Sequence, residues 1–318
     1  MPSQTIAILG GDLRQYYLAD YMIKEGYDVI CYDTFPFPHD SLDFQKKLRF
    51  ADSLKAALED ARLIVGPMPF SKDGVSLWCG KPTQDAIPCR ENEKPLPDAE
   101  HQVLFGDTKN APLSLETLLS LLQPWQILAG GGIDKNFAHA ALKKKIVLFD
   151  FLEDPILNLR NAALTAEGLL ACLIYETPFS LTDCSILLLG FGRCGKEIGK
   201  RLKFFTSKLR VFDSNESASL SAYSMGFSPI SQEELSGSDL PYDIVINTIP
   251  DRILSKEQLM ALPKDCVLFD IASVPYGFDF ILTEQLQLKS VLCPGIPGRF
   301  APRESGKLLG NSLKTALF

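Results

Sequence analysis

Short apolar runs alternate with stretches of helical periodicity along most of this chain. Runs of four to six apolar residues are typical of buried parallel strands, and repeats of about 3.6 residues are typical of amphipathic helices. The predicted strands cover 5–9, 28–32, 61–66, 126–129, 146–150, 186–189, 209–212, 243–246, 267–271 and 290–293. The predicted helices cover 14–24, 54–60, 113–122, 135–144, 154–175 and 304–318, with a further helical pattern around Ile198 and Leu202. This alternation predicts an α/β fold.

The pattern divides into two series, which predicts two Rossmann-like open-sheet domains around a central cleft. The first, flavodoxin/Rossmann-like domain covers 1–152 and takes the substrate, and the second covers 153–299 and includes the long linking helix. We expect the C-terminal segment, from about 300 to 318, to return to the first domain. Segment 75–107 is rich in prolines and charges, which indicates a long surface excursion or a β-hairpin.

A glycine motif at the start of the second domain indicates a nucleotide site. Gly190, Gly192 and Gly195 are spaced G-x-G-x-x-G between a predicted strand and a predicted helix. The first glycine permits a tight turn, the second lets a pyrophosphate approach the backbone, and the third lets helix and strand pack closely. The helix N-terminus offers free N–H groups and the positive end of a dipole, so Arg193 and Cys194 are also expected at the cofactor.

The other strand ends of this domain extend the predicted cofactor site. Asp213 follows the second strand, 18 residues beyond Gly195, where a carboxylate binds the adenosine ribose hydroxyls. We expect three later loops to line the ribose and nicotinamide. Their predicted contact residues are Thr248, Ile249, Pro250, Ala272, Ser273, Pro294 and Gly295.

The first domain begins with a second strand–glycine–helix unit, but its loop differs. Gly10 and Gly11 precede Asp12, and no glycine completes the dinucleotide motif. A carboxylate at a helix N-terminus would repel a pyrophosphate, whereas Arg14 would attract a carboxylate. This loop is interpreted either as a small-molecule site or as a capped helix with a solvated arginine.

Two further groups of residues are open to a functional and a structural interpretation. Asn161, Thr165 and Gly168 share one face of the linking helix, which indicates either substrate hydrogen bonding or a solvated stripe with a close helix crossing at Gly168. Arg299, in the C-terminal loop, is a second candidate for binding a carboxylate.

Composition narrows the class of protein. The net charge of −7 disfavours nucleic acid and anionic membranes as partners. No apolar run has the length of a membrane span, and no leader is expected before the first strand. The eight cysteines are scattered without a C-x-x-C pair, which indicates reduced thiols in the cytoplasm. No metal is expected, because no His or Cys group has ligand spacing.

With these segments in place, the chain resembles the family of dipicolinate synthase A subunits over nearly its whole length. The resemblance is carried by ILGGDLRQ at 8–15, TAEG at 165–168, LLLGFGRCG at 187–195, INTIP at 246–250, LFDIAS at 268–273 and PGIPGRFAP at 294–302. Gly277, Asp279, Phe280, Ser305 and Gly306 also match. Segment 75–107 looks like an insertion relative to this family.

The resemblance implies an oxidoreductase that converts a hydroxylated tetrahydrodipicolinate from the lysine pathway into pyridine-2,6-dicarboxylate during sporulation. It implies a nicotinamide dinucleotide and a flavoprotein-like B subunit, and a homo-oligomer is expected. Arg14, Arg299 and the glycine amides at Gly10, Gly11 and 130–132 suit the two carboxylates, while Asp12 and Asp279 are candidates for proton transfer. The family is associated with NADP, but the acidic turn Asp213–Glu216 favours NAD by charge.

Three alternatives remain open. A D-2-hydroxyacid or formate dehydrogenase would share the two-domain plan, but it needs a histidine late in the dinucleotide domain. The histidines here are His39, His101 and His139, all in the first domain. S-adenosylhomocysteine hydrolase shares the two-domain architecture, but its basic, aromatic C-terminal tail has no counterpart in this sequence. A non-catalytic, regulatory dinucleotide-binding protein is the third alternative.

Overall fold

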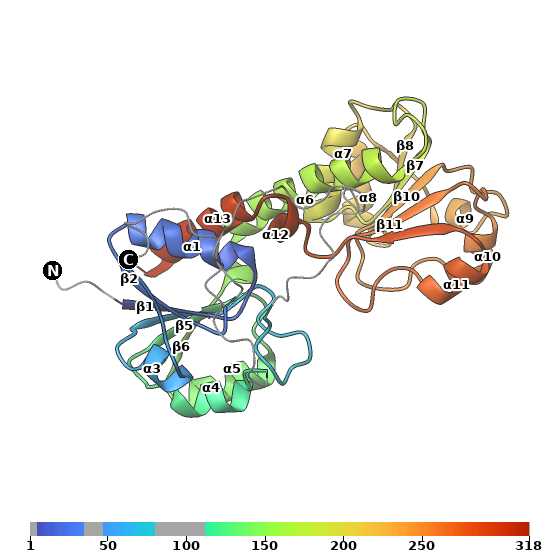
Figure 1. Cartoon of the computed structure of the whole chain (residues 1–318). Coiled ribbons are helices and arrows are strands. Elements are labelled where there is room, and N and C mark those ends of the chain that lie inside the picture. Colours follow the sequence, from blue (N-terminus) through green and yellow to red (C-terminus); the bar gives the residue numbers. More distant parts are fainter. Residues whose placement is uncertain (1–4, 35–46, 80–111, 318) are drawn as a thin grey trace, which may run out of the picture. The chain divides into compact units, whose positions relative to one another are not determined.

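The computed structural model describes residues 5–34, 47–79 and 112–317, and the chain divides into two compact units (Figure 1). The first unit comprises 1–160 and 301–318, and the second comprises 161–300. The division falls inside the linking helix, after Arg160, and so lies several residues later than the boundary expected from the sequence. Most of the predicted excursion, 80–107, lies outside the described residues, as do His39 and His101.

The first unit contains a parallel six-stranded sheet in the order β3-β2-β1-β4-β5-β6. Its strands are β1 (Thr5–Leu9), β2 (Asp28–Tyr32), β3 (Leu48–Phe50), β4 (Leu63–Val65), β5 (Ile127–Gly130) and β6 (Val147–Asp150). The central strands are apolar throughout because helices cover both faces. The edge strand β3 was not predicted, since its three residues are half-buried or exposed and leave no apolar run.

Helices cover both faces of this sheet. On one face α1 (Leu13–Lys24), α13 (Pro302–Leu317) and the first turn of α6 (Pro155–Glu176) pack on a shared core. On the other lie α3 (Leu54–Leu58), α4 (Leu115–Leu121) and α5 (Lys135–Lys143). The 3₁₀ turn η2 (Phe151–Glu153) connects β6 to α6.

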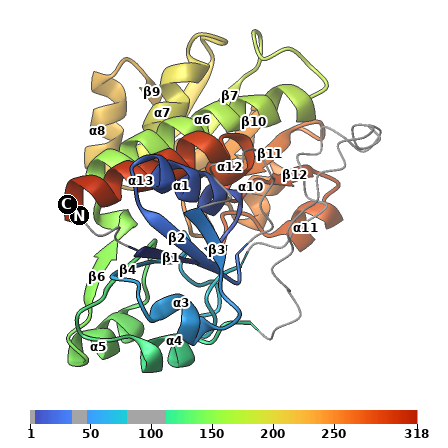
Figure 2. The same ribbon diagram turned by 60° about the vertical axis from the view of Figure 1, so that its left-hand side comes forward.

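The C-terminal helix lies alongside α1, as Figure 2 shows, and this confirms its predicted return to the first unit. Two glycines of α13 allow the close approach. A Cβ at Gly306 would lie 2.5 Å from the Arg14 carbonyl oxygen, and a Cβ at Gly310 would lie 2.3 Å from the Tyr21 ring. The backbone of one helix therefore packs directly against the other.

The second unit repeats the plan with the order β12-β11-β10-β7-β8-β9, again parallel. Its strands are β7 (Ile186–Leu189), β8 (Leu209–Phe212), β9 (Ser228–Pro229), β10 (Ile244–Asn247), β11 (Val267–Asp270) and β12 (Lys289–Leu292). The predicted fold of two Rossmann-like sheets is confirmed. The two-residue edge strand β9 was not predicted.

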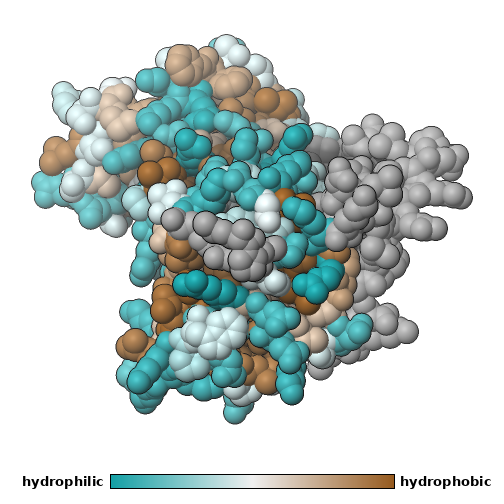
Figure 3. Space-filling view, turned by 90° about the vertical axis from the view of Figure 1, so that its left-hand side faces the viewer, coloured by the Kyte–Doolittle hydropathy of each residue, from teal (hydrophilic) through white to brown (hydrophobic). Residues whose placement is uncertain are grey.

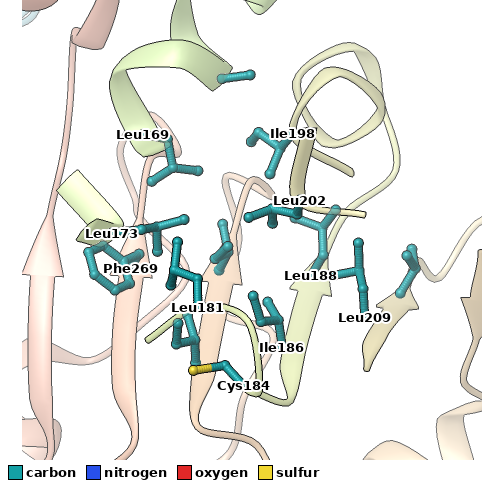
Figure 4. Packing of buried hydrophobic residues seen from close by; sticks show 14 of the residues in the cluster. Leu169, Leu173, Leu181, Cys184, Ile186, Leu188, Ile198, Leu202, Leu209 and Phe269 are labelled. Atoms are coloured by element: carbon teal, nitrogen blue, oxygen red, sulfur yellow. The ribbon is translucent and has the colours of Figure 1, made fainter. Parts of the chain in front are cut away.

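Two layers of helices enclose the second sheet. Figure 4 shows the core beneath α6 and α7 (Arg193–Leu202), where Leu169 and Leu173 of α6 meet Ile198 and Leu202 of α7 over the central strands. The remaining helices are α8 (Glu216–Ser224), α9 (Gln232–Leu235), α10 (Lys256–Met260), α11 (Phe280–Gln285) and α12 (Ile296–Phe300). Helices cover both faces of both sheets. Ligands in this fold therefore bind at the carboxyl ends of the strands.

The surface is mixed in character. On the face shown in Figure 3, hydrophilic side chains predominate, and hydrophobic ones lie in separate groups between them. No helix in the described part of the chain is long and apolar enough to cross a membrane.

Candidate dinucleotide and substrate sites

The three glycines after β7 have three different surroundings. Gly190 has a φ of +93°, and a Cβ there would lie 2.2 Å from Thr248 Oγ1. A Cβ at Gly195 would lie 2.1 Å from the Gly190 carbonyl oxygen, so α7 packs directly on the turn. A Cβ at Gly192 would meet nothing within 4 Å. The open position is the one where a pyrophosphate approaches the backbone, so the loop fits a dinucleotide.

The first turn of α7 presents its amides without a side-chain cap. Gly192 is the N-cap residue and supplies no acceptor, and both Gly192 and Arg193 are exposed. The dipole of the helix and these amides favour an anion at this point. Cys194, one position further, is half-buried, and burial raises the pKa of its thiol. It therefore stays neutral beside the loop.

Asp213 is held against the glycine loop. Its Oδ2 accepts a 2.7 Å hydrogen bond from the Phe191 amide, inside the loop itself, and its Oδ1 accepts a 2.8 Å bond from the Asn215 amide. The carboxylate is thus fixed at the end of β8, next to the expected pyrophosphate position. From this position a carboxylate can accept hydrogen bonds from the adenosine ribose hydroxyls.

The neighbouring basic residues lie elsewhere. Arg210 binds Glu234 Oε1 at 3.0 Å and the Ser228 carbonyl at 3.3 Å, toward the edge strand. Lys208 donates to the Asp183 carbonyl at 3.1 Å, before β8 begins. Both basic residues have their partners away from the glycine loop, whereas Asp213 holds a negative charge beside it.

The loops after β10, β11 and β12 carry the other predicted cofactor residues. Thr248 is tied to the glycine loop, because its amide and hydroxyl both donate to the Leu189 carbonyl at 2.9 and 3.0 Å. Ala272 is buried, while Pro250, Ser273, Pro294 and Gly295 are exposed and Ile249 is half-buried. All of these residues lie at the carboxyl ends of the strands, the edge where ligands bind in this fold.

Two buried polar residues at these strand ends were not among the predicted site residues. Asn247 ends β10 and Asp270 ends β11, and both are fully buried. The sequence contained a sign of their role, because each is a polar residue at the last position of an otherwise apolar strand. What they hold became visible only in the structure.

In the first unit, the glycine amides are already occupied. Gly10 donates to the Tyr32 carbonyl at 3.2 Å and Gly11 to the Trp78 carbonyl at 2.9 Å. Gly131 donates to the Pro67 carbonyl at 3.0 Å and Gly132 to Asp150 Oδ1 at 2.9 Å. Each of these four N–H groups bonds a protein oxygen in the structure, and the expectation that glycine amides here bind ligand carboxylates stays a prediction.

Asp12 and Arg14 form an ion pair with each other. Asp12 caps α1 by accepting from the Arg14 amide at 3.0 Å, and both of its oxygens accept from the Arg14 guanidinium at 2.9–3.1 Å. Arg14 is only 7% exposed and also donates to the Met68 carbonyl. The structure therefore supports the capping interpretation for Asp12, but it places Arg14 in a buried pair and not in solvent. Neither a free base nor an isolated cation is present at this loop.

An aromatic ring and a second cation lie beside this pair. The Lys72 ammonium lies 4.6 Å from the centroid of the Trp78 ring, and the Arg14 guanidinium carbon lies 6.0 Å from it. Neither Lys72 nor Trp78 was predicted, because both lie in a segment without periodicity. Both cations thus lie within cation–π distance of one indole ring.

Asp33 and Cys79 meet at the same end of the first sheet. Cys79 donates its thiol proton to the Asp33 carbonyl oxygen at 3.1 Å. Burial raises the pKa of the Asp33 carboxyl. Burial, together with the charges of Asp33 and Asp12, raises the pKa of the Cys79 thiol to about 11. Asp33 has a φ of 53°, a conformation unusual for a residue with a side chain.

The remaining predicted residues have structural partners. Asp279 caps α11 and pairs with Arg252 at 3.0 Å, so its carboxylate is also engaged. A Cβ at Gly168 would lie 2.3 Å from Ile296, which resolves that position in favour of a close helix crossing. Thr165 is buried and donates to the Asn161 carbonyl at 2.9 Å within α6.

Arg299 lies beside two thiols. Its Nε is buried, and among the described residues it has no hydrogen-bond partner. The hydrogen bond from Cys293 lowers the pKa of Cys172, and the Arg299 charge acts in the same direction. The expectation that Arg299 binds a substrate carboxylate stays a prediction.

No group of three acidic, histidine or cysteine side chains in the described ranges could hold a metal ion. His139 is exposed on α5.

Comparison with known proteins matches this geometry to a family. The family model that matches residues 5–86 describes the N-terminal domain of the dipicolinate synthase A subunit. The A subunit of dipicolinate synthase from Bacillus subtilis (strain 168) is 27% identical over 98% of this chain and 95% of its own length. Over nearly its whole length the chain is therefore similar to the dipicolinate synthase A subunits, and its N-terminal part matches their family model.

Solved structures share the fold of this family. The A chain of dipicolinate synthase from Bacillus subtilis matches with a TM-score of 0.76 at 22% identity, covering 100% of this chain and 96% of its own. The A subunit from Bacillus halodurans matches with a TM-score of 0.76 at 20% identity, over 98% and 97%. An L-alanine dehydrogenase has the same plan at a TM-score of 0.56 and 13% identity, over 98% and 88%. The chain thus shares the two-domain fold of these proteins.

Proposed function

We propose that this chain is a catalytic A subunit of dipicolinate synthase, which oxidises a hydroxylated tetrahydrodipicolinate to pyridine-2,6-dicarboxylate with NAD. The observation that carries the proposal is the match to the Bacillus subtilis protein over 98% of the chain. An intact glycine loop, open at Gly192 and bordered by Asp213, supports it.

The proposed reaction balances as loss of one water and of two hydrogens. A hydroxyl group and a ring hydrogen leave as water, and a hydride and a proton leave to form the aromatic ring. A bound nicotinamide dinucleotide supplies the hydride acceptor. The protein's own task is to bind two carboxylates, to orient the ring and to accept the proton.

The strand ends of the first sheet suit the dicarboxylate. Arg14 and Lys72 place two cations around Trp78, and Asp12 neutralises only one of them. A carboxylate bound there would gain charge-assisted hydrogen bonds, and the indole would contact the ring. Among the carboxyl groups at this end, Asp33 has the raised pKa expected of a group that takes up a proton.

The choice of NAD over NADP rests on Asp213. A 2′-phosphate at the adenosine ribose would face this carboxylate, with repulsion of about 1 kcal/mol per unit charge in water and about 4 kcal/mol in a partly dry site at 4 Å. A tenfold preference needs only about 1.4 kcal/mol. Arg210 and Lys208, the nearby cations in sequence, have partners away from the loop.

Parallel titration of NAD and NADP tests this preference. We expect wild-type protein to bind NAD at least about tenfold more tightly. Asp213→Ala removes the repulsion and frees the Phe191 amide, so the preference should fall or reverse. Glu216→Ala, which removes the other carboxylate of the turn, is the matched control and should change the ratio less. Tighter binding of NADP by wild-type protein, unchanged by Asp213→Ala, would refute the assignment.

The proposal extends to the protein's setting. We propose that the chain works in the cytoplasm of a sporulating cell, as a homo-oligomer and together with a flavoprotein-like B subunit. Support comes from the family alone, so co-purification with the product of a neighbouring B-type gene is the direct test.

Turnover by purified protein decides the function. Hydroxytetrahydrodipicolinate is generated in place from aspartate semialdehyde and pyruvate, and pyridine-2,6-dicarboxylate is measured by terbium luminescence, with and without the B-type partner. Product formation together with reduction of NAD is the expected result. Dinucleotide binding without product, with or without the partner, would instead indicate a regulatory binding protein.

A further inference from the structure

Two buried polar side chains meet at the carboxyl edge of the second sheet. Asn247 and Asp270 are the last residues of β10 and β11 and lie opposite each other in the strand register. Both side chains are 0% exposed. Burying a carboxylate costs folding free energy unless hydrogen-bond donors surround it. Asp270 therefore needs several donors around it.

Asp270 accepts four hydrogen bonds. Its Oδ1 accepts from Asn247 Nδ2 at 3.0 Å and from the Ala272 amide at 3.0 Å. Its Oδ2 accepts from the Gly277 amide at 2.6 Å and from the Phe278 amide at 3.3 Å. The carboxylate therefore fastens both ends of the loop 271–278.

Asn247 joins this loop to the preceding one. Its Oδ1 accepts from the Ile249 amide at 3.1 Å, and its Nδ2 donates to the Ile249 carbonyl at 2.9 Å as well as to Asp270. A Cβ at Gly277 would lie 2.1 Å from Asn247 Nδ2, so the loop packs directly on the amide. The loops 248–250 and 271–278 are thus one hydrogen-bonded unit.

The order of the strands places this unit relative to a dinucleotide. The glycine loop follows β7, and Asp213 follows β8 on one side of it, whereas β10 and β11 lie on the other side. A dinucleotide spans the point where the strand order reverses. With the adenosine ribose at Asp213 and the pyrophosphate at Gly192, its nicotinamide half extends over the ends of β10 and β11.

We propose that Asp270, through Asn247, is a positioning residue that holds the loops 248–250 and 271–278 in place for the nicotinamide half of the dinucleotide. Because both side chains are fully buried, they act on the cofactor through the loops and not by contact. The inference rests on the proposed function of the second unit as a dinucleotide-binding domain.

Two ligands separate positioning from general stability. NADH carries both halves of the dinucleotide, and ADP-ribose lacks the nicotinamide. Asp270→Asn keeps the size of the side chain but turns an amide NH₂ toward backbone donors on one side. We expect NADH affinity to fall about tenfold or more, while ADP-ribose affinity stays within about twofold.

Asp243→Asn is the matched control. Asp243 accepts from the Ser185 amide at 2.7 Å at the opposite, amino end of the same sheet. Its replacement also removes a carboxylate that bonds a backbone amide, but far from the loops concerned. Both ligands should then bind as they do to wild-type protein.

Gly277→Ala keeps the buried carboxylate and displaces the Asn247 amide, so it decides the matter if Asp270→Asn does not fold. The same selective loss of NADH binding is expected. Equal loss of both ligands, or no loss of either, in a folded variant would overturn the positioning role. Failure of wild-type protein to bind ADP-ribose would instead refute the proposed function.

Discussion

Gly192 and Gly195 lie three residues apart, yet replacing each with alanine should give opposite results. At Gly195 the added methyl would lie 2.1 Å from the Gly190 carbonyl oxygen and 2.9 Å from its carbon. At Gly192 it would meet nothing within 4 Å, and the φ of −73° suits any residue. We therefore expect Gly195→Ala to damage the fold and Gly192→Ala to damage binding.

The size of each effect follows from these contacts. A relaxed carbon–oxygen contact is about 3.3–3.6 Å, so α7 must move by more than about 1 Å in Gly195→Ala. Overpacking costs about 1–3 kcal/mol, of which the better helix propensity of alanine returns about 0.5–1 kcal/mol. In Gly192→Ala the only cost to stability is the poorer N-cap residue, within about 1 kcal/mol.

In Gly192→Ala the main effect should be weaker ligand binding. The methyl occupies the space through which a pyrophosphate reaches the amides of α7. Losing one charge-assisted hydrogen bond of about 1.5–3 kcal/mol weakens affinity roughly tenfold to more than a hundredfold. ADP-ribose should be affected as much as NAD, because both carry the pyrophosphate.

Urea denaturation and calorimetric titration of ADP-ribose on both variants measure the two effects. The expected pattern is a lower denaturation midpoint for Gly195→Ala, and a normal midpoint with weak binding for Gly192→Ala. Full affinity in folded Gly192→Ala would show that the pyrophosphate does not approach this loop, and the reasoning would fail. Gly192→Glu, which adds charge as well as bulk, should abolish binding with the circular dichroism spectrum retained.

Three further predictions concern the rest of the molecule. Gly306→Val should separate α13 from α1 and lower the free energy of unfolding by about 1–3 kcal/mol in urea titrations, because its side chain meets the α1 backbone. Arg14→Ala should weaken binding of pyridine-2,6-dicarboxylate in calorimetry by about 1.5–3 kcal/mol while leaving ADP-ribose unaffected, and equal binding by the variant would exclude this cation from the site. Burial raises the pKa of Cys266 to about 12 from 9.0, so the folded protein keeps a proton that the unfolded chain loses above pH 9. Stability should therefore decline as pH rises from about 9 toward 12, and Cys266→Ala should show a smaller decline.

The geometry of the glycine loop after β7 could be predicted from sequence because its parts are contiguous. Strand, glycine turn, helix, second strand and Asp213 all lie within 186–213, and Gly195 packs on Gly190, only five residues before it. The contact of Gly190 with Thr248 depends instead on the pairing of distant strands. The parallel sheets were also predictable, since buried strands must be apolar on both faces. The edge strands β3 and β9 were not predicted, because strands of three and two residues are too short to show a hydrophobic pattern.

Other features depended on segments far apart in the chain. The amides of Gly10 and Gly11 are taken by carbonyls of Tyr32 and Trp78, and no local pattern shows which acceptors will reach them. Gly168 turned out to be a helix crossing because Ile296, more than a hundred residues later, packs on it.

The same reason explains the pair at the ends of β10 and β11. Sequence alone showed that Asn247 and Asp270 each end an apolar run, which is compatible with any turn. Only the pairing of the two strands brought them together, and only the return of Gly277 and Phe278 supplied the donors that a buried carboxylate requires. Local sequence determined which groups are present, and the tertiary structure decided which hydrogen bonds they still have to offer.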